Sequence, residues 1–350
     1  MPDVLRPAAD TTMTTTATKP TATHPDVSDF EVRHRSTTPV HVLGHARSGT
    51  SVFVRLLRKY LHVAFGTESQ FIFRFQQRLA EYGDLHQETN RRRLVEDICR
   101  ERWFERTHRR LGFETTPDAI LADVSDFTYA GVLDATFRQL AGYLEMQRWG
   151  DKTPEYINHL PDLYALFPDA RYIHVARDGR DVALSAFEQP FGMKNIYCAA
   201  VDWTDAMQKV QAFRRRCPES QFFEVRYEDF LTDPVPVFEQ LIAFLDIDDT
   251  DGSLRQFIAD NIDGDLKRGN FEKWRTRLSP AEIRRFDRIA HDHLVHFGYE
   301  STANASVVPG GLPAVWWNLD NKARKLLRAD YWNDNLYKLR LRLTRSSHRK

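Results

Sequence analysis

The sequence predicts an α/β fold: a P-loop-like, doubly wound parallel sheet flanked by helices, with a helical insert and a C-terminal helical extension. Three short apolar runs have the nearly continuous hydrophobic character of strands buried on both faces, at residues 40–44, 171–176 and 221–225. Helical patterns separate these runs. Such alternation favours a parallel sheet that binds ligands at the carboxyl ends of its strands.

The expected strands and helices follow one another along the chain. The strand at 40–44 leads into a helix over 51–61, which would carry Val52, Leu56 and Tyr60 on one face. A helix is predicted from Pro154 to Leu166, because proline is favoured in the first turn of a helix. The strand at 171–176 comes next. A further helix before the strand at 221–225 carries Trp203, Met207, Val210 and Phe213.

Composition changes along the chain define four expected regions. Residues 1–37 are rich in Thr, Ala and Pro and poor in large apolar side chains, so we expect this segment to be disordered. The main domain is predicted over 38–300. Within it, residues 71–147 form a charged, mostly helical insert.

The C-terminal extension, residues 301–350, carries Trp316-Trp317 and Tyr331-Trp332. It ends in a basic amphipathic pattern that includes Lys338, Arg340, Arg342, Arg345, Arg349 and Lys350. A helix of this kind lies on a membrane or a partner. Packing on its own domain or across a homodimer is an equally good interpretation.

Bulk composition excludes some classes of partner and predicts a location. The chain has 350 residues with 49 Lys plus Arg and 49 Asp plus Glu, so no global field favours nucleic acid. Its three cysteines, Cys99, Cys198 and Cys217, have no metal-binding or disulfide spacing. No apolar run is long enough to cross a bilayer. We therefore expect a cytoplasmic protein, peripheral to the inner membrane face if its C-terminal helix binds lipid.

The most informative motif is Gly44-x-x-x-x-Gly49-Thr50-Ser51, which follows the first strand and opens the first helix. An NTP-binding P-loop has a lysine where this chain has Thr50. The glycines still let the backbone turn tightly and direct N–H groups at an anion. The cation would come from Arg47. A loop of this kind suits a phosphosulfate better than a magnesium-bound triphosphate.

The segment Ala46-Arg-Ser-Gly-Thr-Ser51 resembles the 5′-phosphosulfate loop of sulfotransferases that use 3′-phosphoadenosine 5′-phosphosulfate (PAPS). Further segments resemble that family in the same order. They are Trp149–Pro154 with Leu166–Ser185, Val225–Phe230 with Thr232–Pro234, and Lys267–Arg275. The loop is most similar to the arginine-type loops of bacterial, carbohydrate and protein-tyrosine sulfotransferases. Val52 stands where cytosolic members place an adenine-stacking tryptophan.

The resemblance implies a role for each matching residue. The 5′-phosphosulfate would be bound by Arg47, Ser48, Gly49, Thr50 and Ser51. Arg177 and Ser185 would bind the 3′-phosphate, because a strand-end arginine and a hydroxyl eight residues later can face one anion. Tyr227 would line the adenine. The late basic loop would close over the nucleotide, with Lys267, Arg268 and the backbone of Gly269 also contacting the 3′-phosphate.

Catalysis by such an enzyme requires a base for the acceptor hydroxyl and a cation at the leaving oxygen. By resemblance, Glu68 is the base and Lys152 is the cation, with Arg47 also acting on the sulfuryl group. Cytosolic members use a histidine instead, which keeps four further candidates open: His45, His62, His86 and His108. No metal is expected.

We therefore predict a PAPS-dependent sulfotransferase that acts on a carbohydrate, a glycosylated metabolite or a glycolipid. A phenol or a peptide tyrosine is the alternative acceptor, and the 71–147 insert is expected to shape the acceptor site. A P-loop kinase is disfavoured by Thr50. A non-catalytic module that binds adenosine 3′,5′-bisphosphate (PAP), the product of PAPS, is the remaining alternative.

Overall fold

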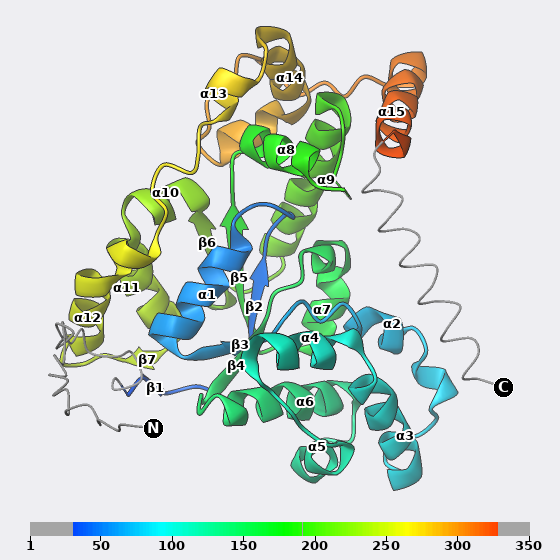
Figure 1. Ribbon diagram of the computed structural model, residues 1–350, viewed down its shortest axis with the longest axis vertical. Helices are drawn as coiled ribbons and strands as arrows, with labels where there is room; N and C mark the ends of the chain where they lie inside the picture. Colours follow the sequence, from blue (N-terminus) through cyan, green and yellow to red (C-terminus); the bar gives the residue numbers. More distant parts are fainter. Residues whose placement is uncertain (1–30, 191, 328–350) are drawn as a thin grey trace, which may run out of the picture. The chain divides into compact units, whose positions relative to one another are not determined.

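The computed structural model describes residues 31–190 and 192–327. Its centre is a five-stranded parallel sheet in the order β3-β4-β2-β5-β6 (Figure 1). The strands are β3 (Val63–Phe65), β4 (Arg148–Asp151), β2 (Val40–Leu43), β5 (Arg171–Ala176) and β6 (Phe222–Arg226). This topology confirms the predicted doubly wound α/β fold.

The three predicted strands are β2, β5 and β6, and each lies within one residue of its expected bounds. Strands β3 and β4 were not predicted. β3 has only three residues, and β4 begins with Arg148 and ends with Asp151 although all four of its residues are buried. Neither strand therefore shows the apolar run typical of a central parallel strand.

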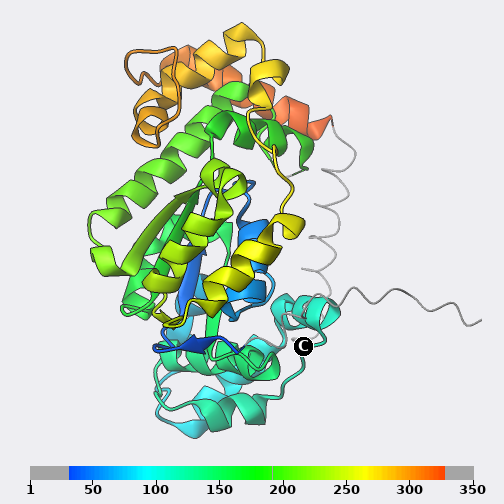
Figure 2. The ribbon, with the colours of Figure 1, turned by 90° about the vertical axis from the view of Figure 1, so that its left-hand side faces the viewer.

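Helices cover both faces of the sheet (Figure 2). On one face, α1 (Thr50–Leu61) packs with α10 (Tyr227–Thr232) and α11 (Pro234–Phe244). Ring centroids lie 5.1 Å apart for Phe53 and Phe230 and 5.9 Å apart for Tyr60 and Phe238. On the other face, α9 (Ile196–Arg214) packs against β5 through Phe213. Both faces are thereby removed from water, which explains the uninterrupted hydrophobicity of β5.

The region 71–147 is helical, as predicted, and packs against the β3–β4 edge of the sheet. Its last helix fixes β4, because Trp149 stacks on Phe137 at a centroid distance of 4.7 Å and its indole N–H donates to Asp134 at 2.8 Å. The helices are α2 (Ile72–Gln76), η2 (Leu79–Glu81), α3 (Glu88–Cys99), α4 (Arg102–Leu111), α5 (Pro117–Asp123) and α6 (Tyr129–Tyr143).

The segment predicted as one helix from Pro154 to Leu166 is divided in two: η3 (Pro154–His159) is a 3₁₀ helix and α7 (Leu160–Leu166) is an α-helix. Pro161 lies in the first turn of α7, where a missing N–H costs no hydrogen bond, so a new helix begins there.

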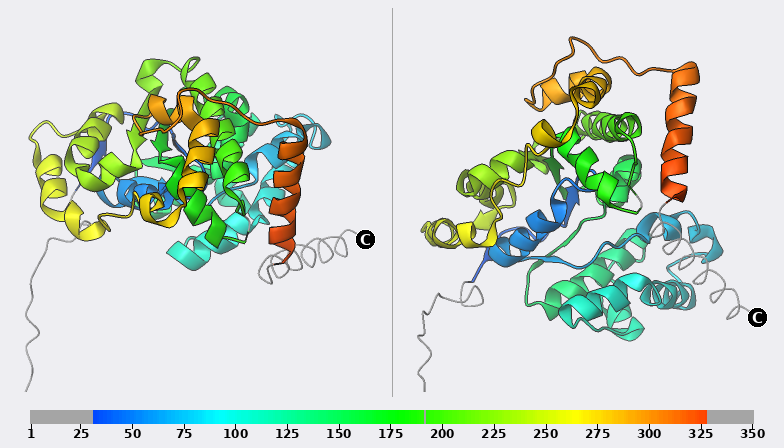
Figure 3. Two further views of the ribbon diagram at one scale, coloured as in Figure 1. Left: turned by 90° about the horizontal axis from the view of Figure 1, so that it is seen from above. Right: turned by 45° about the horizontal axis from the view of Figure 1, so that its top comes forward.

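Helix α8 (Gly179–Glu188) follows β5, and the remaining helices come after β6 (Figure 3). They are α12 (Ser253–Asn261), the 3₁₀ turn η5 (Ile262–Asp265), α13 (Trp274–Arg277), α14 (Pro280–His296) and α15 (Gly311–Leu326). A further 3₁₀ turn, η4 (Glu219–Gln221), directly precedes β6.

The expectation of disorder through residue 37 does not hold for its last residues. Strand β1 (Arg33–His34) pairs antiparallel with β7 (Ile247–Asp248), and Val32 is buried. Backbone pairing with a distant segment, which composition cannot reveal, orders this part of the chain. Residues 1–30 lie outside the described residues, as do Tyr331-Trp332 and the basic positions from Lys338 to Lys350.

Candidate functional site

The loop between β2 and α1 is built on two glycines that no other residue could replace without strain. Gly49 caps α1 with a φ of 87°, and a Cβ there would lie 2.1 Å from Cε2 of Tyr227. A Cβ on Gly44 would lie 2.6 Å from Cγ2 of Thr50. Arg47 also has a positive φ, 78°, a backbone conformation that costs energy for a residue other than glycine. The loop is therefore tightly wound around the N-terminus of α1, where backbone N–H groups favour an anion.

The structure brings Arg47, Arg177 and Ser185 together, although they are up to 138 positions apart in the chain. Nε of Arg47 donates to Oγ of Ser185 at 2.9 Å. One guanidinium nitrogen of Arg177 donates to the carbonyl of Arg47 at 3.0 Å, and the other donates to the carbonyl of Asn270 at 2.8 Å. The Arg177 guanidinium also lies 4.6 Å from the centroid of the Tyr227 ring. Two cations and a hydroxyl thus gather beside the loop.

A pocket of about 350 Å³ opens between this loop, α8 and the segment before α13. Seven of the predicted donor-binding residues line it: Arg47, Gly49, Thr50, Ser51, Arg177, Ser185 and Tyr227. Ser48 is fully buried behind the loop, and its Oγ has no hydrogen-bond partner among the described residues. The pocket therefore combines positive charge, an exposed helix N-terminus and an aromatic face.

The late basic segment enters the pocket through residues other than those predicted. The lining includes Asn270, Lys273 and Arg277 and omits Lys267, Arg268 and Gly269. Arg268 instead donates to the carbonyl of Thr232 at 2.8 Å and forms an ion pair with Asp263.

Buried Trp274 is the sequence signal that could have identified these pocket residues. It anchors α13, which fixes Lys273 just before it and Arg277 one turn later. Charge content and exposure alone did not distinguish these side chains from Lys267 and Arg268, because all four are exposed.

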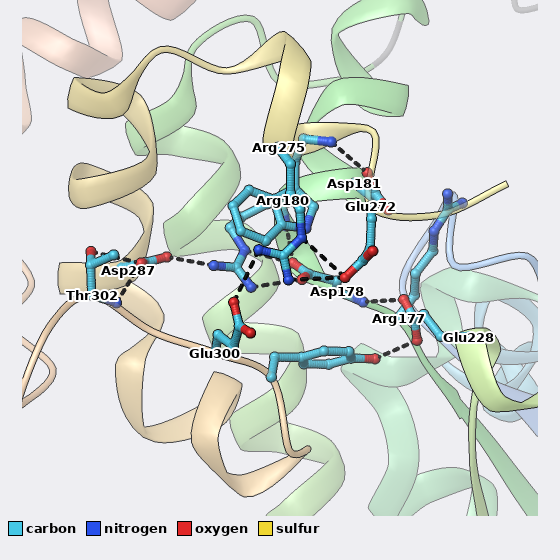
Figure 4. Close-up of polar contacts among 12 residues, drawn as sticks. Arg177, Asp178, Arg180, Asp181, Glu228, Glu272, Arg275, Asp287, Glu300 and Thr302 are labelled. Atoms are coloured by element: carbon cyan, nitrogen blue, oxygen red, sulfur yellow. Dashed lines mark hydrogen bonds and ion pairs between the residues drawn. The ribbon is translucent and has the colours of Figure 1, made fainter. Parts of the chain in front are cut away.

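A buried network of charges holds the strand end that carries Arg177 (Figure 4). Arg180 is 2% exposed, and its guanidinium pairs with Asp178 at 2.7 Å and with Asp287 at 3.1 Å while lying 3.6 Å from the Trp274 ring. Glu228 accepts from the backbone N–H of Asp178 at 3.0 Å. Asp181 accepts from the backbone N–H of Trp274 at 3.0 Å. These contacts tie β5, α8, α10, α13 and α14 together behind the pocket.

Glu68 and Lys152, the two residues predicted to act in catalysis, form an ion pair with Nζ 2.5 Å from Oε1. Nζ of Lys152 also lies 3.3 Å from Oγ of Ser51 in the phosphate loop. Glu68 follows β3 and Lys152 follows β4, and because these neighbouring strands are parallel their carboxyl ends meet at one edge. Gln70, two residues after Glu68, has a φ of 56°, so this loop is also strained.

A buried polar group supports the Lys152 loop from below. Asp151 accepts from the Ser69 hydroxyl at 2.8 Å, and Tyr156 lies 2.8 Å from the same hydroxyl. The backbone N–H of Ser69 donates to Thr153 at 3.1 Å. Burial raises the pKa of Asp151 to about 6, against the opposing effects of the Ser69 hydrogen bond and the Lys152 charge. The loops after β3 and β4 are therefore locked to each other.

Of the four histidines considered as bases, His45 alone lies in the phosphate loop. Its Nε2 lies 2.9 Å from Asp202, and its Nδ1 lies 2.8 Å from the carbonyl of Ala46. His62 caps the far end of α1, about 18 Å along a helix of that length. His86 lies in the loop before α3 and His108 on α4, and neither lines the pocket.

Two features are missing from the described residues, 31–190 and 192–327. No group of three or more His, Cys, Asp or Glu side chains in these ranges could hold a metal ion. No helix in them is both long and apolar enough to cross a bilayer.

Two curated proteins that are similar in sequence to part of this chain are both named as sulfotransferases. Omega-hydroxy-beta-dihydromenaquinone-9 sulfotransferases of Mycobacterium bovis and Mycobacterium tuberculosis are 28% identical over 127 residues, which is 32% of this chain. The match spans only 33% of the length of these curated relatives.

Solved structures that align with this chain include two sulfotransferase domains. The domain from the Synechococcus PCC 7002 olefin synthase is 21% identical with a TM-score of 0.45, over 76% of this chain and 97% of that one. The domain from the curacin biosynthetic pathway is 18% identical with a TM-score of 0.47, over 76% and 99%. The model of the sulfotransferase family matches residues 39–251, which hold the phosphate loop, Glu68, Lys152, Arg177 and Tyr227. This chain therefore belongs to the sulfotransferase family.

Proposed function

We propose that this protein transfers a sulfuryl group from PAPS to an acceptor hydroxyl. The observation that carries the proposal is the junction of two sites at Ser51. On one side of this residue lies the pocket with Arg47, Arg177 and Ser185, and on the other lies the Lys152–Glu68 pair, 3.3 Å from the Ser51 hydroxyl. A donor phosphosulfate bound at the loop would therefore present its sulfur beside a cation and a base.

The pocket residues fit a nucleotide with two separate anionic groups. The loop from Arg47 to Ser51 would hold the 5′-phosphosulfate, with the unpartnered Ser48 hydroxyl available beneath it. Arg177 and Ser185 would hold the 3′-phosphate, and Tyr227 would line the adenine. Lys267, Arg268 and Gly269 remain candidates for the 3′-phosphate only if the late loop moves, whereas Lys273 and Arg277 already line the pocket.

The chemistry divides between two side chains. Glu68 would accept the proton of the acceptor hydroxyl as the new oxygen–sulfur bond forms. Lys152 would stabilise the negative charge that develops on the bridging oxygen as its bond to sulfur breaks. The sulfuryl group then leaves on the acceptor, and PAP remains as the product.

Lys152 can pair either with Glu68, as in the structure, or with a donor anion bound at Ser51. Lys152 is 10% exposed and Glu68 is 35% exposed, so solvent reaches mainly the carboxylate of the pair. A donor anion at Ser51 would compete with Glu68 for the ammonium group. Drawing Lys152 toward the donor would release Glu68 to act as a base, which couples donor binding to activation of the acceptor.

Our proposal for the acceptor is a hydroxyl of a carbohydrate, a glycosylated metabolite or a glycolipid, with a phenol or a peptide tyrosine as the alternative. A second candidate comes from the curated relatives, whose name specifies an omega-hydroxylated dihydromenaquinone. A lipid alcohol of that kind presents an aliphatic hydroxyl, as a sugar does. Both acceptors need a base because their hydroxyls are neutral at physiological pH.

An acceptor screen with sulfur-labelled PAPS tests the proposal. Sugars, glycolipids, phenols, tyrosine peptides and hydroxylated isoprenoid quinols form the panel, and each reaction is scored for labelled product and for PAP. We expect PAP release coupled to one acceptor class. PAP binding without turnover on any class would favour the non-catalytic alternative. Tight magnesium-dependent ATP binding with phosphoryl transfer would favour the kinase.

A further inference from the structure

Helix α15 packs on the protein through polar contacts. The Asn321 side chain is buried and accepts from the backbone N–H of Lys194 at 2.7 Å. The Asn195 amide donates to the carbonyl of Trp317 and to Asp320, both at 2.8 Å. The inward side of α15 is therefore held by hydrogen bonds, with the Trp317 ring as its main apolar contact.

The opposite side of α15 is apolar and exposed. Leu312 is 85% exposed, Leu319 59%, Trp316 57% and Val315 55%. At 100° per residue these four side chains fall within one stripe about 100° wide, and Asn321 points the other way. The helix is thus inverted: its polar side faces the protein and its apolar side faces outward.

This stripe concentrates the exposed hydrophobic residues of the described chain. The described residues include eleven exposed large hydrophobic side chains, and six of these eleven lie between Leu312 and Leu327. Scattered exposed side chains need no explanation, but a continuous row on one helix marks an interaction surface.

Charge indicates which partner the stripe fits. Helix α15 carries three basic side chains, Lys322, Arg324 and Lys325, against one acidic side chain, Asp320. Lys322 borders the stripe, and the basic residues lie toward the end of the helix that leads into the arginine-rich C-terminal sequence. Asp320 lies at the other border of the stripe, where Arg324 pairs with it at 2.8 Å. An apolar stripe with tryptophan on a helix of net positive charge is typical of helices that lie in the interface of anionic bilayers.

The attachment point connects the helix to the pocket. Lys194 and Asn195 lie directly before α9, in the segment that follows α8, and α8 carries Ser185 of the pocket. A helix fixed to this segment would hold the α8 side of the pocket next to whatever surface it binds.

We propose that the Leu312–Leu319 face of α15 docks the protein on an anionic lipid bilayer. The face inserts Trp316 and its leucine neighbours among the acyl chains, and Lys322 contacts anionic headgroups. This inference does not depend on the identity of the acceptor.

Vesicle co-sedimentation of the full chain tests the proposal, using phosphatidylcholine vesicles with and without phosphatidylglycerol. The double variant Trp316→Ser/Leu319→Ser should lower the partition coefficient at least tenfold, because it removes two apolar anchors while leaving every basic residue in place. Lys322→Gln should lower it roughly fivefold on anionic vesicles and leave neutral vesicles unaffected. Val295→Ser, at a site 53% exposed on α14, is the matched control and should bind as the native chain does.

Two results would overturn the proposal. One is native-level sedimentation of Trp316→Ser/Leu319→Ser with anionic vesicles. The other is light scattering that shows a native dimer converted to a monomer by the same variant while vesicle binding is unchanged, since the stripe would then be a subunit interface. PAP affinity, measured by calorimetry on each variant, should equal that of the native chain. If the native chain does not bind PAP, that result contradicts the proposed function and leaves the vesicle result to be judged separately.

Discussion

The two halves of the candidate site are built differently. The donor half rests on buried, cross-connected charges: Arg180 and Asp287 are almost fully inaccessible, and Asp178 joins them to the strand end that carries Arg177. The proposed acceptor half presents one ion pair, between Lys152 and Glu68, and the Glu68 side chain is about a third exposed. The first half is fixed before any ligand arrives, whereas the second can exchange partners.

This difference corresponds to the tasks of the two halves. A nucleotide with two anionic groups is bound best by cations whose positions are set in advance, because little ordering is then needed at binding. The proposed base, Glu68, is paired with Lys152 in the structure and would be released when a donor draws Lys152 away. We therefore expect substitutions of Glu68 and Lys152 to change mainly the rate of turnover. Substitutions in the donor half should change mainly folding stability or nucleotide affinity.

The largest expected effect is on turnover, from Glu68→Gln and Lys152→Ala. Removal of a general base costs about 10²–10⁴-fold in rate, so Glu68→Gln should lose most turnover while its PAP affinity does not fall, because the variant no longer competes with the ligand for Lys152. Lys152→Ala should slow turnover by roughly 10²-fold or more and also weaken PAPS binding. Steady-state kinetics and calorimetry on both variants measure this separation.

An acceptor that needs no base gives a second way to separate the roles of Glu68 and Lys152. A nitrophenol that is already ionised at the assay pH needs no base, so it should partly rescue Glu68→Gln and fail to rescue Lys152→Ala. Glu105→Gln, on the exposed surface of α4, is the matched control. Near-native activity of Glu68→Gln on a neutral acceptor would transfer the role of base to His45, the histidine of the phosphate loop.

The next largest effect is on folding stability, in the donor half. Arg180→Leu would leave Asp178 and Asp287 buried without their cation, which costs about 3–5 kcal/mol. Arg109→Leu, which breaks an exposed pair with Glu105, should cost less than about 1 kcal/mol. Denaturant unfolding of the two variants gives the comparison. Equal stability losses would mean that the donor half is not organised by this network.

A smaller effect should distinguish two arginines that the sequence assigned to one phosphate. Arg177→Ala should reduce PAP affinity by about 1.5–3 kcal/mol, roughly tenfold to a hundredfold, and narrow the preference for PAP over adenosine 5′-phosphosulfate, which lacks the 3′-phosphate. Arg268→Ala should change neither, because its guanidinium binds Asp263 and the Thr232 carbonyl outside the pocket lining. If Arg268→Ala lowers PAP affinity as much, the late loop closes over the bound nucleotide.

The donor half could be predicted from the sequence because its residues belong to compact motifs. Gly44, Gly49 and Arg47 lie within six positions, and the strand end at Arg177 is marked by an apolar run. Local backbone geometry then decides where these groups point. The sequence predicted the loop, the strand and the helix for the same reason, since each signal is contained in a few residues.

What could not be predicted depends on contacts between distant segments. Strand β4 carries Arg148, which is stabilised by donating to the carbonyl of Leu245 at 2.6 Å, ninety-seven positions away. The choice between Arg268 and Arg277 depends on how α13 is anchored by Trp274. The inverted face of α15 follows from hydrogen bonds to Lys194 and Asn195 that no periodicity reveals.

The smallest expected effect is a change in folding stability with pH. It tests how buried Asp151 supports the loop that carries Lys152. The pKa of Asp151 is raised from 3.8 to about 6, mainly by burial, so the folded protein binds this proton more tightly than the unfolded chain does. The resulting stabilisation is fully present below pH 4 and is lost as the pH rises toward 6 and above, a change of about 2 kcal/mol. Asp151→Asn, which can still accept from the Ser69 hydroxyl, has no such proton. The unfolding free energy of Asp151→Asn relative to the native chain should therefore increase between pH 4 and pH 7, as measured by denaturant titration across that range. A difference that stays constant with pH would mean that Asp151 keeps an ordinary pKa, and that the Lys152 charge rather than burial controls it.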